Sequence, residues 1–338
     1  MMLKIDRFIT LTCAFALLAV SFSSTACDSA SALFSRPSAT ATVTATPTAT
    51  ATVTSTPTPT PRPTPTLTAT PTVEPLRLSL IFDPPQVRRG HTLLVEVRAN
   101  RPITAVGTLD ERALSFVPDA GRTWAVVGIP VTADVKAHPV QLAVADDLGR
   151  SVSTTVSVMV IAVDFGSEHI DVPADRLPLL EPEIVEEEAA HVGEVFSRVA
   201  MQRLWEDTFI WPLAGQVTSP FGMSRTYNSG QQSYHGGVDI SGDPGAPVVA
   251  SNHGIVALAE PLDVRGGAVV LDHGWGVYSG YYHLSEILVN EGQKVAKGEL
   301  IGRVGSTGLA TGAHLHWEMR VGGILVNPLE WTARRIPE

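Results

Sequence analysis

From residue 211 onward, the chain consists of short apolar runs separated by glycine or proline. Of its 28 glycines, 21 follow residue 210, between runs such as GIVALAE, GAVVLDH and GILVNP. Runs of this length are short for helices but suit strands, and glycine suits the tight turns between paired strands. Residues 211–332 are therefore predicted to form an antiparallel, all-β domain whose strands are joined by hairpins.

Two segments of different character precede this domain. Residues 76–163 contain short β-type runs with turn signals about every 8–12 residues, which is typical of an immunoglobulin-like β-sandwich. Residues 174–207 instead repeat apolar side chains at three- and four-residue steps or their multiples, which predicts a connecting helix. The six glutamates between Glu181 and Glu194 lie outside that stripe and are expected to form a solvated face without a catalytic role. The predicted fold class is thus mainly β.

The first 27 residues have the layout of an export signal. Lys4 and Arg7 precede the apolar run FITLTCAFALLAVSF, which is shorter than the roughly 20 residues of a membrane-spanning helix, and small residues follow it. Cys27 after Ala26 resembles a bacterial lipoprotein signal, although Ser24 stands where such signals usually have an aliphatic residue. We therefore predict a cell-envelope protein with a lipid anchor at Cys27 on the outer face of the membrane. Plain secretion and a retained anchor are the alternatives.

Residues 28–75 are predicted to be a disordered linker rich in threonine and proline. Between residues 40 and 72, threonine occupies nearly every even position, with alanine, valine, serine and proline between. No large apolar side chain recurs, so the segment cannot bury a core. In an extended form of about 3.1 Å per residue, it would reach on the order of 100 Å and let a domain act away from the membrane.

The composition of the chain argues against nucleic-acid binding and limits the ligands that a metal site could use. A net charge of -10 and an isoelectric point near 5.5 argue against a nucleic-acid-binding protein. The two cysteines, Cys13 and Cys27, both lie in the N-terminal signal, so the folded part has no thiol. A zinc site in this chain would have to use histidine and carboxylate ligands. We expect a monomer.

Three short motifs in the last domain carry candidate metal ligands. In GAHLHWEMRV, a period of two places His314 and His316 on one strand face and the apolar side chains on the other. In YHGGVDI, His235 and Asp239 stand four apart, with two glycines that let the backbone bend tightly. In YYHLS, His283 ends an aromatic-rich run. Each motif alone is weak evidence, but three in one domain make a stronger joint case.

Zinc in a hydrolytic site needs three protein ligands and an open position for water. A further histidine near the metal can take up or deliver the proton. The five candidates therefore supply three ligands and two proton-handling histidines. Spacing alone leaves open which three bind the metal.

Residues 212–332 resemble the lysostaphin-type, or LytM-like, peptidoglycan metalloendopeptidases. HGGVD matches the HxxxD motif of that family, YYHLS matches its strand-end histidine, and STGLATGAHLHWE matches its HxH signature. The run VNEGQKVAKGELIGRVGSTG and the entry motif SPFG follow the family as well. Together these motifs are far more specific than any one of them.

The resemblance implies a role for each candidate residue. His235, Asp239 and His316 would bind one zinc ion, and His283 and His314 would be the catalytic histidines. One of these two would act as general base, and both would stabilise the tetrahedral intermediate. None of the five positions departs from the family pattern, and the implied activity is hydrolysis of peptide bonds in bacterial peptidoglycan.

Two other functions compete with this interpretation. Some members of the family have lost ligands and act as regulators, so a non-catalytic cell-wall protein that activates or positions another hydrolase is the main alternative. EGQKVAKGELIG also resembles the hairpin of a lipoyl or biotinyl carrier. Lys294 and Lys297 lack the hairpin-tip setting that a carrier requires, and a carrier would leave the histidines unexplained.

The other histidines are expected to have no ligand role. His253 and His273 belong to turns, while His91, His138, His169 and His191 lie outside the last domain. Trp275, Tyr281 and Tyr282 could line a peptide groove or pack into the core.

Overall fold

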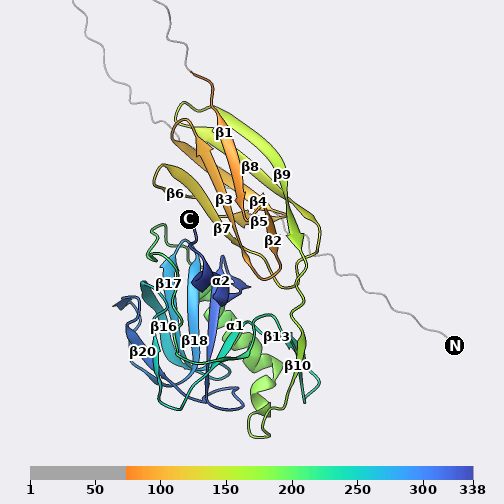
Figure 1. Cartoon of the computed structure of the whole chain (residues 1–338), viewed down its shortest axis with the longest axis vertical. Helices are drawn as coiled ribbons and strands as arrows, with labels where there is room; N and C mark the ends of the chain where they lie inside the picture. Colours follow the sequence, from red (N-terminus) through yellow and green to blue (C-terminus); the bar gives the residue numbers. More distant parts are fainter. Residues whose placement is uncertain (1–73, 338) are drawn as a thin grey trace, which may run out of the picture. The chain divides into compact units, whose positions relative to one another are not determined.

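The computed structural model of the protein describes residues 74–337 (Figure 1). The predicted signal of residues 1–27 with Cys27, and the linker as far as residue 73, lie outside the described residues and stay predictions. Within the described part, no helix has the length and apolar character needed to cross a bilayer.

The segment that follows the linker forms two β-sheets that share one core. The first sheet has the order β1 (Leu78–Asp83), β3 (Thr92–Ala99), β7 (Arg122–Gly128), β6 (Val117–Asp119), and the second has the order β2 (Gln86–Arg88), β9 (Ser151–Ile161), β8 (Ala137–Asp146), β4 (Ile103–Leu109), β5 (Arg112–Leu114). Side chains from both sheets, including Leu93, Val95, Val140 and Val158, are buried together between them. This is the small sandwich that the turn spacing predicts.

The C-terminal domain is built on a ten-stranded sheet in which every neighbouring pair of strands is antiparallel. Its main path is β11 (Val217–Ser219), β14 (Gly237–Ser241), β21 (His314–Val321), β18 (Val277–Ile287), β17 (Gly266–Gly274), β16 (Gly254–Leu262), β19 (Lys294–Val295). Strand β20 (Leu300–Val304) pairs with β18 and β15 (Pro247–Val249), and β22 (Ile324–Val326) pairs with β21; the chain ends in α2 (Pro328–Ala333). The mainly β fold with an antiparallel last domain is confirmed.

The alternation in β21 sorts its side chains as expected. Leu315, Trp317 and Met319 are fully buried in the domain core, on the face away from His314 and His316. The apolar face of the strand therefore anchors it, while its polar face is left for a site.

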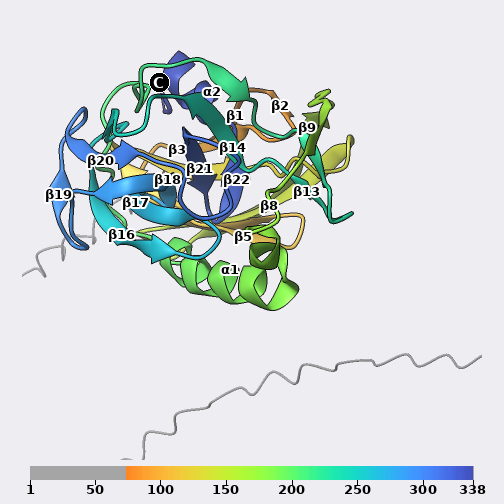
Figure 2. The ribbon, with the colours of Figure 1, turned by 90° about the horizontal axis from the view of Figure 1, so that it is seen from below.

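A small sheet connects the region before the domain to its first hairpin. Strand β10 (Ser167–Ile170) pairs in parallel with β12 (Ser224–Tyr227), which pairs with β13 (Gln232–Tyr234). The 3-10 turn η1 (Leu177–Leu180) and helix α1 (Pro182–Phe196) follow β10. Val192, Val195 and Phe196 of α1 pack against the face of the sheet formed by β16, β17 and β18 (Figure 2).

The helix is shorter than the predicted segment of residues 174–207. It begins at Pro182, a residue that suits a first helical turn, and its last residue is Phe196. The hydroxyl of the next residue, Ser197, donates a hydrogen bond to the Glu194 carbonyl, a side-chain contact that competes with helical hydrogen bonding. Beyond it, Trp205 and Phe209 turn into the core of the β domain without a regular element.

The expectation of a fully solvated glutamate face is also corrected. Glu188 is 6% exposed. Its carboxylate accepts hydrogen bonds from the backbone N–H groups of Val264 and Arg265 and from the Arg265 guanidinium. A helical pattern shows which residues leave the apolar stripe, but it does not show which loop will cover them.

Replacing Trp317 by alanine is expected to lower the free energy of unfolding by about 3–5 kcal/mol, because it empties a fully buried site that the sheet cannot refill. Trp211→Ala is the matched control, since that side chain is 42% exposed. Chemical denaturation of the full chain measures both. Equal losses for the two variants would contradict the assignment of the β21 inner face to the core.

Candidate metal centre

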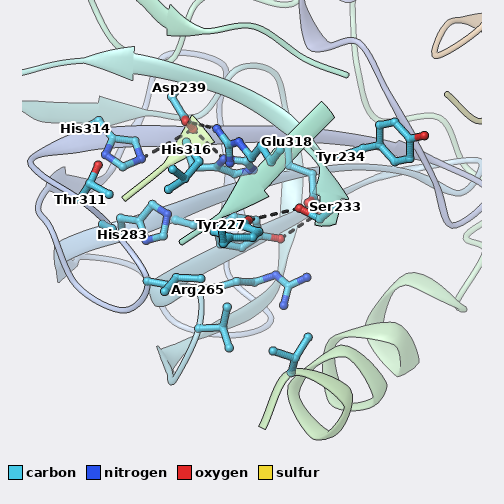
Figure 3. Close-up of a pocket in the computed structure, with 18 of the residues that line it drawn as sticks. Tyr227, Ser233, Tyr234, Asp239, Arg265, His283, Thr311, His314, His316 and Glu318 are labelled. Atoms are coloured by element: carbon cyan, nitrogen blue, oxygen red, sulfur yellow. Dashed lines mark hydrogen bonds and ion pairs between the residues drawn. The ribbon is translucent and has the colours of Figure 1, made fainter. Parts of the chain in front are cut away.

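Strand pairing brings together residues that lie about 80 positions apart in the chain. Asp239 of β14 stands directly opposite His316 of β21, and Tyr282 of β18 stands opposite His316 on the other side. His235 precedes β14 by two residues, and His283 follows Tyr282. The order β14–β21–β18 therefore places Asp239, His283, His314 and His316 along one wall of a pocket (Figure 3), while His235 is buried behind it against Asp239 and His316.

Three of the five form a group that could hold a metal ion. Within the described residues, His235, Asp239 and His316 offer ligand atoms that all lie within 4.8 Å of one another. His235 Nε2 lies 3.0 Å from both Asp239 Oδ1 and His316 Nδ1, and His316 Nδ1 lies 2.8 Å from Asp239 Oδ1. These are the three residues to which the resemblance assigned the metal.

The donor set of this group fits zinc. The Nδ1–H of His235 donates to the Pro220 carbonyl at 2.8 Å, which leaves Nε2 as a lone pair facing Asp239 Oδ1. Two acceptors at that distance need a shared proton or cation between them. Two imidazoles and one carboxylate, with no thiol, form a ligand set typical of zinc in hydrolytic sites.

The second glycine of HGGVD makes room for a ligand. A Cβ on Gly237 would lie 2.8 Å from His316 Nε2 and 2.3 Å from the Trp317 carbonyl oxygen. Glycine is therefore required here by the close approach of β14 to the His316 ring; neither Gly236 nor Gly237 has a positive φ, so the backbone freedom expected from the sequence is not what requires it.

His283 and His314 stand beside this group with defined tautomers. His283 Nδ1 donates to the Thr307 carbonyl at 2.9 Å, and His314 Nδ1 donates to the Gly312 carbonyl at 2.9 Å. Each ring thus keeps Nε2 as its free nitrogen; that of His314 lies 3.6 Å from Asp239 Oδ1. The two ring centroids are 4.9 Å apart, and both rings line the pocket.

The backbone of His283 is held in an uncommon conformation. Its φ is 63°, a left-handed value that few residues other than glycine adopt. The His283 N–H donates to the Arg265 carbonyl at 2.9 Å, so hydrogen bonds hold both its backbone and its ring. A fixed backbone and a fixed ring are what a proton-transfer group needs in order to keep its orientation.

Burial determines the protonation states in the pocket. Burial, followed by the charges that His314 and His316 would carry, lowers the pKa of His283 to about 3. Burial also lowers the pKa of His316, although the neighbouring Asp239 carboxylate opposes the shift. Burial would raise the pKa of Asp239, but interactions with His235 and His316 outweigh it and lower that pKa. Near pH 7, His283 and His316 are therefore neutral and Asp239 is ionised, and a neutral imidazole and a carboxylate are the forms in which such ligands bind a cation.

Polar residues that the motifs did not indicate support the group. Arg225 of β12 donates to Asp239 Oδ2 at 2.8 Å, so Oδ1 is the oxygen left for a metal. Ser219 of β11 places its Oγ 3.0 Å from His235 Nδ1, and Glu168 of β10 contacts both Arg225 and Ser219. No spacing rule links these three residues, because they come from separate strands.

The remaining histidines lie away from this group. His273 is fully buried, its Nδ1–H donates to the His253 carbonyl, and its Nε2 lies 2.7 Å from Ser279 Oγ; burial lowers its pKa to about 4. His91, His138, His169, His191 and His253 do not line the pocket either.

Of the three aromatic residues that could line a peptide groove or pack into the core, only one lines the pocket. Tyr281 is fully buried and hydrogen-bonded to Ser251, so it belongs to the core, and Trp275 is buried as well. Tyr282 is also buried, but it lines the pocket, and its ring stacks on His316 with centroids 5.7 Å apart.

Comparison with known proteins agrees with this arrangement. The sequence profile described as Peptidase family M23 matches residues 233–328, a stretch that includes all five candidate residues. The chain carries a peptidase family M23 domain. The resemblance drawn from the sequence motifs is thereby confirmed.

Two relatives and one solved structure illustrate the range of similar proteins. Peptidoglycan DD-endopeptidase ShyA of Vibrio cholerae is 43% identical over 96 residues, which are 28% of this chain and 22% of that protein. Murein hydrolase activator NlpD of Escherichia coli is 35% identical over 129 residues, which are 38% of this chain and 32% of that protein. A Pseudomonas aeruginosa structure assigned to peptidase M23 has a TM-score of 0.52 and 28% identity, covering 69% of this chain and 89% of that one.

The similarity to the two relatives spans less than a third of their length. The domain is therefore shared, whereas the activity, substrate and partners of the whole protein are matters for proposal.

The close approach of Gly237 to His316 makes a specific prediction. Gly237→Ala is expected to weaken zinc binding by at least about 10-fold, since the added methyl group displaces the His316 ring from the group. Gly312→Ala is the control, because nothing lies within 4 Å of a Cβ at that position. Competition with a chromophoric chelator measures both affinities, and equal affinities would contradict the assignment of His316 as a ligand.

Proposed function

We propose that the protein is a zinc-dependent endopeptidase that hydrolyses peptide crosslinks of bacterial peptidoglycan, with one zinc ion per catalytic domain. The observation that carries this proposal is the convergence of a three-residue ligand group with two tautomer-fixed histidines on one pocket. The peptidase family M23 domain and the DD-endopeptidase named among its relatives support both the reaction class and the substrate.

In this proposal His235, Asp239 and His316 hold the metal. When bound, zinc lowers the pKa of water from 15.7 to about 7 and polarises a carbonyl oxygen, which supplies a nucleophile and an electrophile at neutral pH.

His283 and His314 handle the proton. Because the pKa of His283 lies well below neutrality and its Nδ1–H is occupied by the Thr307 carbonyl, its Nε2 is available to accept a proton at pH 7. His314 presents Nε2 in the same way from the neighbouring strand. One of the two takes up the proton of the attacking water at Nε2, and the imidazolium so formed stabilises the negative charge that develops on the tetrahedral intermediate.

The proposed location follows from the N-terminal sequence. An export signal, a lipid anchor at Cys27 and an extended linker would hold a monomeric enzyme on the outer face of the membrane and let it reach the wall. Metabolic labelling with a fatty acid analogue tests the anchor: a Cys27→Ala protein should lose the label.

The roles of the two kinds of histidine can be separated by substitution. His316→Ala is expected to lose both zinc and activity. His283→Ala is expected to keep zinc and to lose about 10²–10⁴-fold in turnover, the usual contribution of a general acid or base. Metal analysis and mass spectrometry of the new amino termini released from purified peptidoglycan measure the two effects. His253→Ala, a turn residue outside the pocket, serves as the control and should match the unmodified protein.

A second candidate function is activation or positioning of another wall hydrolase. The observation that favours it is the similarity to murein hydrolase activator NlpD, while the complete five-residue set favours the enzyme. An activator should release no amino termini from peptidoglycan of any chemotype, yet should increase solubilisation by a separately added wall hydrolase. An enzyme should release them alone, and the identity of those termini would name the bond that is cut.

A further inference from the structure

The region before the family domain reaches the metal centre. Strand β10 and strand β12 both precede the matched residues 233–328, and their parallel pairing places Glu168 beside Arg225. The side chain of Glu168 is only 20% exposed. A carboxylate from the connecting segment is thus held in the interior next to the candidate ligands.

Glu168 binds both side chains that support the ligands. Its Oε1 accepts from Arg225 Nε at 2.6 Å and from Ser219 Oγ at 2.7 Å. The same Arg225 donates through Nη2 to Asp239 Oδ2 at 2.8 Å and to Ser219 Oγ at 2.9 Å. Ser219 Oγ in turn lies 3.0 Å from His235 Nδ1. Glu168 is therefore separated from Asp239 by Arg225 alone and from His235 by Ser219 alone.

The charge of Glu168 matters as much as its hydrogen bonds. Arg225 is mostly buried and lies against Asp239, so its positive charge opposes the approach of a second cation to that carboxylate. Glu168 forms an ion pair with Arg225 and balances that charge within the network. The arginine can then fix the Asp239 carboxylate without weakening the attraction of the group for a divalent cation.

Other contacts keep the connecting segment in place on the pocket. Arg176 Nη1 donates to the carbonyl oxygens of Ser306, Gly308 and Ala310, which flank the residue that binds the His283 ring. Glu188 holds the loop that contains Arg265, whose carbonyl accepts the His283 N–H. Because Arg176 and Glu188 anchor the segment to two adjoining loops beside the pocket, the position of Glu168 is not left to the parallel strand pairing alone.

We propose that Glu168 is a positioning residue of the zinc site, acting through Arg225 on Asp239 and through Ser219 on His235. This inference rests on the zinc site of the proposed function and adds a required residue from outside the family domain. Glu168 touches neither metal nor substrate, and its effect is to orient two ligands and to set the charge around them.

Zinc affinity of the full chain tests the inference without reference to hydrolysis. Glu168→Gln keeps the shape of the side chain and removes its charge, and it is expected to weaken zinc binding by about 10- to 100-fold in chelator competition. Glu187→Gln, on the exposed face of α1, is the matched control and should bind zinc like the unmodified protein. Circular dichroism and thermal unfolding of the zinc-free proteins show whether the fold is retained.

A double substitution tests whether Glu168 acts on the zinc site through Arg225. In an Arg225→Met background, Glu168→Gln should have an effect several-fold smaller than in the unmodified protein, because the partner whose charge it balances is gone. A folded Glu168→Gln protein with the zinc affinity of Glu187→Gln would overturn the inference and leave the proposed enzyme intact. A protein that binds zinc with this dependence but cleaves no peptidoglycan would overturn only the enzyme. An unmodified protein that binds no zinc would overturn both.

Discussion

The register between β14 and β21 is the constraint on which the rest of the site depends. It places Asp239 opposite His316 and turns both side chains to the same face of the sheet. A slip of one residue would send His314 and His316 toward the core and bring Leu315 and Trp317 to the surface, so the buried apolar face enforces the register. The packing energy of the domain thus also maintains the geometry of the ligand group.

In the side chains of the site, a neighbouring residue binds one of the two hydrogen-bonding atoms and thereby fixes the orientation of the group. The Pro220 carbonyl occupies one nitrogen of His235, the Thr307 carbonyl occupies one of His283, and Arg225 occupies one oxygen of Asp239. The free nitrogen of His235 and the free oxygen of Asp239 then face each other within the ligand group. Burial also favours the neutral form of His283 and His316, and neutral imidazole is the form that binds a cation.

Several features of the site could be predicted from the sequence for physical reasons. The HxH pair needs only the period of two along a strand, whereas the glycines after His235 suggested a tight bend and not the close approach of Gly237 to His316 that the structure shows. By contrast, Glu188 was expected in solvent and is buried, and the connecting helix stops at Phe196 because Ser197 and the apolar residues after it form other contacts. A periodic pattern describes one element, whereas these outcomes depend on which loop or strand lies against it.

The sequence by itself determined the class of the domain, the five candidate residues and the absence of a thiol ligand, since strand alternation, motif spacing and residue type are local properties. Only the tertiary structure decided which nitrogen of each histidine is free, which oxygen of Asp239 is available, and that Glu168 and Arg225 belong with the ligands. Those features depend on contacts between strands that are far apart in the chain, and a local sequence pattern does not predict such contacts.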